Sequence, residues 1–218
     1  MSRANLELKS MFVHLPKCAG SSLSSPEWNR GNGHRTISDF EIECKRKGLE
    51  RFFKWAFVRN PFDRIVSAYE DCPEIFPHAP TFQKFIDILH ANRGELFKIK
   101  SLRFTHVPGM GLPIGRIHFM PMHLMLRDSH GDMQVDFVGR YENLEEDFIK
   151  VQNHLGIDPS PLPHKNKRAN KPNRRNTPWL DLYTPELIEK VWEIYAEDIS
   201  IFKYPIPDLP LIPNLQKT

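Results

Sequence analysis

The sequence predicts an α/β fold, with a central and mostly parallel sheet and helices on both of its faces. Two stretches, residues 11–23 and 52–70, each read as a short apolar strand, a turn and the start of a helix. Strands that alternate with helical patterns are typical of a parallel sheet. A chain of 218 residues suits one such domain. We therefore predict a single domain over residues 1–218, with a polar lead-in at 1–10 and a proline-rich tail at 205–218.

The first of these stretches, MFVHLPKCAGSSL, combines a strand with a turn of small residues. Its apolar run is followed by Lys17 and then by small residues only, from Cys18 to Ser22. Such a turn before a helix start presents backbone N–H groups to an anion, and serine hydroxyls and a lysine ammonium add donors and charge. It is not the common nucleotide-binding loop, which ends in Gly-Lys-Ser/Thr and places its lysine after the turn. An ordinary strand-to-helix turn is the alternative interpretation.

The second stretch, FFKWAFVRNPFDRIVSAYE, places a charged residue at the end of a strand. Residues 53–58 are apolar and aromatic, Arg-Asn-Pro ends the run, and Pro61 suits the start of the next helix. Arg59 therefore follows a strand, and Ser67 lies one or two turns into a helix. In an open α/β sheet, ligands bind at the carboxyl ends of the strands.

These two motifs together resemble those of a known family. HLPKCAGSS is similar to the 5′-phosphosulfate-binding loop of sulfotransferases, and FVRNPFDRIVSAY is similar to their 3′-phosphate-binding strand and helix. The resemblance is closest to the carbohydrate-type sulfotransferases, including soluble bacterial relatives, and it spans residues 11–204. DFVGRYENLEEDF and YTPELIEKVWEIYAEDISIFKY also fit that family. Cys18 and Ala19 stand where many relatives have Thr-Gly; both pairs are small, so we expect the loop geometry to be kept without the threonine hydroxyl.

The resemblance implies a P-loop-like three-layer fold and an enzyme that uses 3′-phosphoadenosine 5′-phosphosulfate. The sulfuryl group would pass to a hydroxyl acceptor, a carbohydrate for this branch of the family, and no metal would be needed. Lys17 would stabilise the departing phosphate oxygen. The residues expected to bind the donor are Lys17, Cys18, Ala19, Gly20, Ser21, Ser22, Arg59, Ser67, Lys167 and Arg168.

Sulfuryl transfer to a hydroxyl needs a base, and a neutral imidazole titrates in the right range. His34, in GHRTISDFE, matches the position of a histidine in the resembling bacterial proteins, so it is the first candidate. A solvent-exposed loop histidine is the alternative interpretation. His118 is the second candidate and His14 the third. We expect His14 to point away from the site and pack, because successive strand residues alternate sides.

Residues 164–175, HKNKRANKPNRR, are basic and contain no acid. Such a run is usually solvated. It could instead close on the highly charged donor through Lys167 and Arg168, or bind an anionic glycan acceptor.

Periodicity and cap signals predict the remaining elements. The expected helices cover residues 36–47, 81–92, 143–155 and the stretch that starts at Thr184, and a further strand covers 135–140. Ser38 and Glu41 would form a capping box for the first of these helices. The Met-rich residues 117–126 are expected in the core.

Composition limits the other functions. The formal net charge is only +3, and an interleaved aromatic platform is missing, so nucleic acid is not the expected partner. Three cysteines without a CxxC pair favour reduced thiols and a cytoplasmic location. Cys18 fits a small filler of the loop better than a thiol activated by Lys17. The sequence shows neither an apolar run of membrane-spanning length nor a signal-peptide core.

Two other functions fit a related fold. A nucleotide kinase would need ATP and Mg²⁺, and the missing Gly-Lys-Ser/Thr argues against it. A non-catalytic phosphonucleotide-binding protein would bind the donor without transferring its sulfuryl group.

Overall fold

We analysed a computed structural model of the chain that describes residues 4–23, 36–46, 51–71, 78–97, 116–128, 130–162 and 178–208. Tertiary contacts divide the chain into two compact units. The first unit consists of Met1–Arg59 and Met122–Pro172, and the second unit consists of Asn60–Pro121 and Asn173–Thr218. Each is described by itself below, and the single domain expected over residues 1–218 stays a prediction.

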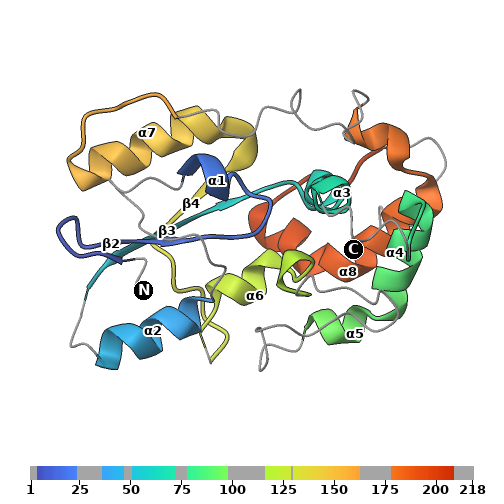
Figure 1. Ribbon diagram of the computed structural model, residues 1–218, viewed down its shortest axis with the longest axis horizontal. Helices are drawn as coiled ribbons and strands as arrows, with labels where there is room; N and C mark the ends of the chain where they lie inside the picture. Colours follow the sequence, from blue (N-terminus) through green and yellow to red (C-terminus); the bar gives the residue numbers. More distant parts are fainter. Residues whose placement is uncertain are drawn as a thin grey trace. The chain divides into compact units, whose positions relative to one another are not determined.

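The first unit is built on a sheet with the strand order β1-β2-β3-β4. The strands are β1 (Ala4–Asn5), β2 (Ser10–Val13), β3 (Phe53–Val58) and β4 (Phe137–Arg140). The last three run parallel, and only β1 is antiparallel to its neighbour (Figure 1). The predicted α/β class with a mostly parallel sheet is confirmed. The short strand β1 was not predicted, because it lies within the polar lead-in.

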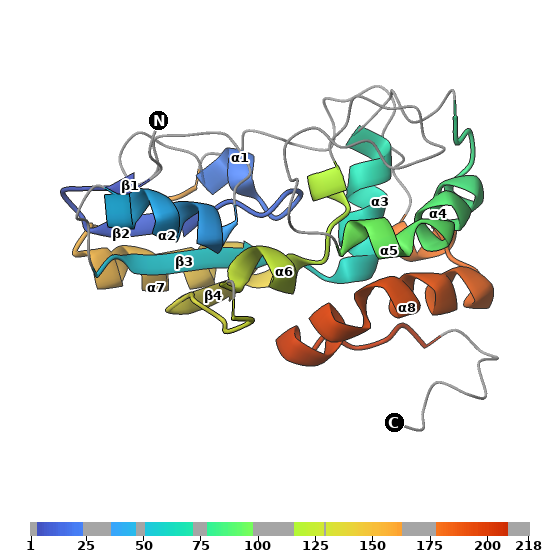
Figure 2. The same cartoon turned by 90° about the horizontal axis from the view of Figure 1, so that it is seen from below.

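Helices cover both faces of this sheet, as Figures 1 and 2 show. Helices α1 (Gly20–Leu23) and α7 (Leu144–Leu155) lie on one face, and α2 (Ile37–Arg46) and α6 (Met122–Leu126) lie on the other. Side-chain alternation along the strands explains both layers. The aromatic residues of the α7 face form a buried cluster with that helix: Phe12, Trp55, Phe57 and Phe148. On the opposite face, the Lys54 ammonium lies 3.4 Å from the Glu41 carboxylate of α2.

The predicted cap of α2 is wrong by two residues. Thr36 is the capping residue, and its hydroxyl accepts the Asp39 N–H at 3.2 Å while the Asp39 carboxylate accepts the Thr36 N–H at 3.1 Å. This reciprocal pair forms a capping box, the motif that was predicted two residues later, at Ser38 and Glu41. The Ser38 hydroxyl donates instead to the Arg127 carbonyl at 3.2 Å, because the helix has already begun at residue 37.

The second unit is helical in its described residues. Its elements are α3 (Pro61–Asp71), α4 (Phe82–Ala91), α5 (Arg93–Leu96), the 3₁₀ helices η3 (Arg116–His118) and η6 (Trp179–Leu182), and α8 (Pro185–Phe202). The predicted cap of α8 is confirmed, since the Thr184 hydroxyl accepts the Leu187 N–H at 3.3 Å. Thr81 caps α4 in the same way, through the Lys84 N–H.

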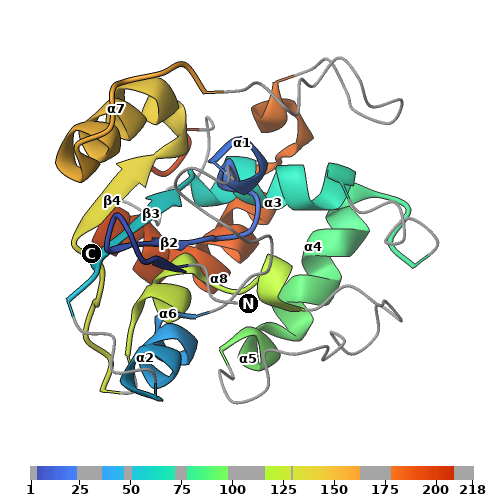
Figure 3. The ribbon, with the colours of Figure 1, turned by 60° about the vertical axis from the view of Figure 1, so that its left-hand side comes forward.

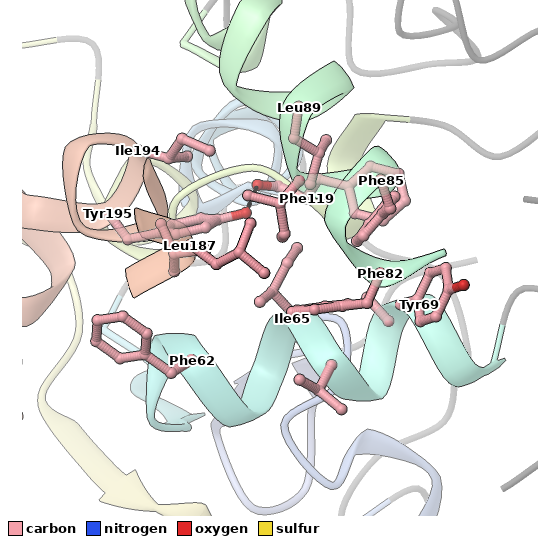
Figure 4. Close-up of a cluster of buried hydrophobic side chains, with 14 of the residues drawn as sticks. Phe62, Ile65, Tyr69, Phe82, Phe85, Leu89, Phe119, Leu187, Ile194 and Tyr195 are labelled. Atoms are coloured by element: carbon pink, nitrogen blue, oxygen red, sulfur yellow. Dashed lines mark hydrogen bonds between the residues drawn. The ribbon is translucent and has the colours of Figure 1, made fainter. Parts of the chain in front are cut away.

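The core of the second unit lies where α3, α4 and α8 face one another (Figure 4). It is rich in aromatic rings, and its polar groups bond to backbone carbonyls. The Tyr195 hydroxyl donates to the Phe119 carbonyl at 2.6 Å, and the Tyr183 hydroxyl donates to the Phe62 carbonyl at 2.8 Å. Burial raises the pKa of both phenols, so each stays a protonated donor. Within the described residues, no helix of either unit is both long and apolar enough to cross a membrane.

Candidate functional site

The carboxyl ends of β2, β3 and β4 lie side by side at one edge of the first unit's sheet. In the parallel register Val13 lies opposite Ala56, and Val58 lies opposite Arg140. The loop that follows β2, the residue that follows β3 and the turn that follows β4 are therefore neighbours. This is the edge at which the sequence predicted an anion site.

The loop after β2 has an unusual backbone. Lys17 and Ala19 adopt left-handed conformations, with φ values of 67° and 62°. Non-glycine residues rarely adopt this conformation, and it persists only where the surrounding structure fixes it. Left-handed residues that alternate with ordinary ones turn N–H groups toward one side, which forms an anion-binding concavity. Ala19 therefore occupies a backbone conformation that suits glycine better than alanine.

Two of the N–H groups after this turn are used within it. The Ser22 and Leu23 N–H groups donate to the Ala19 carbonyl at 2.9 and 3.0 Å. Ser22 therefore offers its half-buried hydroxyl, rather than its N–H, to an anion. Ser21 is exposed at the start of α1.

His14 lies beneath this turn rather than in the open. The side chain is 8% exposed, and its ring stacks on Phe12 with a centroid distance of 5.7 Å. A Cβ atom on Gly20 would lie 1.6 Å from the His14 Nε2 atom, so only glycine fits there. The ring packs, as expected, but it lies against the loop rather than pointing away from it, and it explains why the turn needs a glycine at position 20.

Cys18 faces the interior of the first unit. It is 1% exposed, and its Sγ atom lies 3.7 Å from the Met122 Sδ atom of α6. A thiol in this place fills space between the loop and α6. This placement agrees with the interpretation of Cys18 as a small filler. Cys18 then contributes to the loop through its backbone.

Arg59 joins the three strand ends. The side chain is 7% exposed, and its Nη1 group donates to the Lys17 carbonyl at 3.1 Å. The guanidinium carbon also lies 4.1 Å from the centre of the Tyr141 ring. A charged fork is thus held against the left-handed loop, with an aromatic ring across it.

Tyr141 is the residue that sequence reasoning missed. It opens the 3₁₀ helix η4 (Tyr141–Asn143) directly after β4. Its one sequence signal is its place after a strand end, in the segment DFVGRYENLEEDF that resembles the family. The sequence alone did not relate Tyr141 to Arg59, because only the strand register shows that the ends of β3 and β4 are neighbours.

The other predicted site residues belong to the second unit or fall outside the described residues. Ser67 is 5% exposed on α3 of the second unit, and His118 is partly exposed in η3, where its carbonyl accepts the Arg64 Nη2 group at 3.4 Å. His34, Lys167 and Arg168 lie outside the described residues, so their roles stay predictions. The described residues hold no group of three metal-ligating side chains, and whether a metal is needed also stays a prediction.

Comparison with known proteins identifies the family of the chain. A model of the sulfotransferase family matches residues 15–205, and the chain belongs to that family. Carbohydrate sulfotransferase 14 of Danio rerio is 25% identical over 94% of this chain, and carbohydrate sulfotransferase 12 of Mus musculus is 25% identical over 80%. Carbohydrate sulfotransferase 10 of Gallus gallus is 25% identical over 83% of the chain. The recognition of a carbohydrate-type sulfotransferase from the sequence is confirmed.

The chain spans only part of these relatives, namely 62%, 45% and 54% of their respective lengths. None of the solved structures matches the chain significantly.

Proposed function

We propose that the protein transfers the sulfuryl group of 3′-phosphoadenosine 5′-phosphosulfate to a hydroxyl group of a carbohydrate. The observation that carries the proposal is the contact of Arg59 with the left-handed loop at Lys17. It brings a lysine, a turn that can form an anion-binding concavity and a buried guanidinium together at the carboxyl edge of a parallel sheet. The sulfuryl donor carries anionic groups at its 5′ and 3′ positions. A lysine, a guanidinium and backbone N–H groups suit the binding of such anions.

Lys17 and the loop would act on the 5′ end of the donor. In sulfuryl transfer, the bond between sulfur and the oxygen that bridges it to the 5′-phosphate breaks. Negative charge grows on that oxygen as the bond breaks. An ammonium group and backbone N–H groups that are already in place stabilise this charge without reorganisation. The new bond forms between sulfur and the acceptor oxygen, whose proton passes to a base. His34 is the base that we propose from the sequence, and His118 is the alternative.

Arg59 would bind the 3′-phosphate, because its planar fork suits two oxygens of a phosphate group. This contact would separate the donor from ATP, which lacks a phosphate at the 3′ position. Ser67 and the basic residues Lys167 and Arg168 are proposed to assist from the sequence alone. A carbohydrate acceptor is proposed because the similar proteins are named carbohydrate sulfotransferases. A cytoplasmic location is likewise proposed from the cysteine pattern.

Two measurements test this proposal. Calorimetric titration should show that adenosine 3′,5′-bisphosphate binds more tightly than ATP, with or without Mg²⁺. A transfer assay with labelled donor and a panel of glycans should then show labelled product that is lost in His34→Ala. Preferential binding of ATP with Mg²⁺ would favour the nucleotide kinase and contradict the proposal. Tight binding of the bisphosphate without transfer to any glycan in the panel would instead favour a non-catalytic binding protein.

A further inference from the structure

The sheet register brings Tyr141 to Arg59. Val58 of β3 pairs with Arg140 of β4, so the residues that follow these two are adjacent as the strands end. Figure 3 shows the chain leaving β4 and turning at once into α7. The aromatic ring therefore reaches the guanidinium because of where two parallel strands stop, and not through a local sequence contact.

The Arg59 guanidinium lies over the face of the Tyr141 ring. The Arg59 guanidinium carbon lies 4.1 Å from the ring centre, and Arg59 is 7% exposed. A ring face attracts a cation more strongly where water is largely excluded. A guanidinium that lies flat on a ring keeps its N–H groups for oxygen acceptors, since these groups lie in its plane. The ring can therefore fix the plane of the fork while the fork donates to oxygen atoms around its edge, as it does to the Lys17 carbonyl.

The backbone at Tyr141 is held independently of its ring. The preceding Arg140 N–H donates to the Asp147 carboxylate of α7 at 2.8 Å. Asp147 is 7% exposed, and its other oxygen accepts the Lys150 ammonium at 2.6 Å. This anchor fixes the turn between β4 and α7, so removing the ring should leave the turn in place.

We propose that Tyr141 is a positioning residue for the nucleotide donor. Its ring holds the Arg59 guanidinium in the plane from which the fork contacts the Lys17 carbonyl and the 3′-phosphate. The inference rests on the proposed function, because the orientation of the Arg59 guanidinium matters for binding only if the ligand carries a 3′-phosphate. A purely structural role differs in one respect: any side chain of similar volume would then serve, whereas a positioning role needs an aromatic face.

The experiment compares aromatic and aliphatic residues at position 141. For each variant, calorimetry gives the ratio of the affinities for adenosine 3′,5′-bisphosphate and adenosine 5′-phosphate, which differ only in the 3′-phosphate. Tyr141→Phe should keep the wild-type ratio, because the ring remains. Tyr141→Leu should lower the ratio by about tenfold, the usual size of a partly desolvated cation–π contact. Tyr141→Met, which keeps more of the volume, should behave like Tyr141→Leu, and it replaces that variant if leucine prevents folding.

Two controls make the result specific. Phe137→Leu removes another ring of β4, one that packs on Phe57 at a centroid distance of 6.5 Å, so it should change thermal stability but not the affinity ratio. In an Arg59→Met background, Tyr141→Leu should have no further effect on the ratio, because the ring acts through the arginine.

Three results would overturn the inference. Equal ratios for Tyr141→Phe, Tyr141→Leu and Tyr141→Met would reduce Tyr141 to packing. A full effect of Tyr141→Leu in the Arg59→Met background would show that the ring acts by another route. A wild-type protein without any preference for the bisphosphate would overturn the proposed function itself, and this inference with it.

Discussion

Two buried arginines near each other in the sequence have different surroundings. Arg64 lies in α3, is 2% exposed and donates to the Met120 and His118 carbonyls of the second unit. Arg59 follows β3, is 7% exposed and contacts both the carbonyl of the left-handed Lys17 and the Tyr141 ring. The first arginine satisfies two backbone carbonyls of the second unit, which is a structural task. The second supports a strained loop at a sheet edge, which is where strain is expected to serve binding.

The difference teaches that burial and charge do not by themselves mark a functional residue. Both side chains are buried cations, and both donate to backbone carbonyls. The two arginines differ in the acceptor: the His118 and Met120 carbonyls in the second unit for Arg64, and the left-handed loop at the carboxyl edge of the sheet for Arg59. Variants of the loop should therefore change binding and rate, whereas variants around Arg64 should change stability.

The largest expected effect is that of Lys17→Ala on sulfuryl transfer. The variant loses the ammonium group that would stabilise the departing oxygen. The transfer rate should therefore fall on the order of 10²–10³-fold, with little change in the midpoint of thermal unfolding. Lys9→Ala is a matched control, because Lys9 is an exposed lysine that also has a left-handed backbone, with φ 45°. Both variants are assayed with the same acceptor. Equal transfer rates for Lys17→Ala and Lys9→Ala would show that Lys17 takes no part in the mechanism.

The two arginines can be compared directly as methionine variants. Arg64→Met leaves two carbonyls without this donor, so it should cost about 1–3 kcal/mol of unfolding free energy. Arg59→Met should cost less, about 1 kcal/mol, since it affects one partly buried carbonyl, but it should weaken adenosine 3′,5′-bisphosphate binding at least tenfold. Urea unfolding and calorimetry on both variants would contradict the comparison if Arg64→Met proved to be the poorer binder while remaining stable.

Gly20→Ala should affect stability and binding together. The added methyl would overlap the His14 ring, and overpacking of this kind typically costs about 1–3 kcal/mol. The turn would have to shift to relieve the overlap, so nucleotide affinity should fall as well. His14→Ala in the same chain should restore part of both losses, because it removes the ring. If His14→Ala restores neither, the contact between the two residues is not what fixes the turn.

The smallest expected effect is that of Ala19→Gly. Glycine relieves the left-handed strain of about 1–2 kcal/mol but gives the unfolded chain more freedom, worth about 0.4–1 kcal/mol. The variant should therefore be slightly more stable, by less than about 1.5 kcal/mol, and should bind nucleotide as the wild type does. Thermal unfolding that showed a clear loss of stability would mean that the Ala19 methyl packs more usefully than its backbone strain suggests.

Local signals were enough for much of the fold. The strand-type runs at 11–13 and 53–58, the start at Pro61 and the cap at Thr184 could each be read from a few neighbouring residues, because cap chemistry and side-chain alternation are local. The capping box of α2 shows the limit of such reading. Thr36 with Asp39 and Ser38 with Glu41 both fit the pattern, and the hydrogen bond of Ser38 to the distant Arg127 carbonyl belongs to the folded chain.

By itself, the sequence determined the family, the α/β class and the motif residues Lys17 and Arg59, because each lies in a continuous stretch with its own pattern. Only the tertiary structure decided that Arg59 contacts Lys17 and Tyr141, and that the His14 ring occupies the space beside Gly20. The two contacts of Arg59 depend on the register of strands that are far apart in the chain. Register follows from the packing of both sheet faces together, and no single segment contains that information.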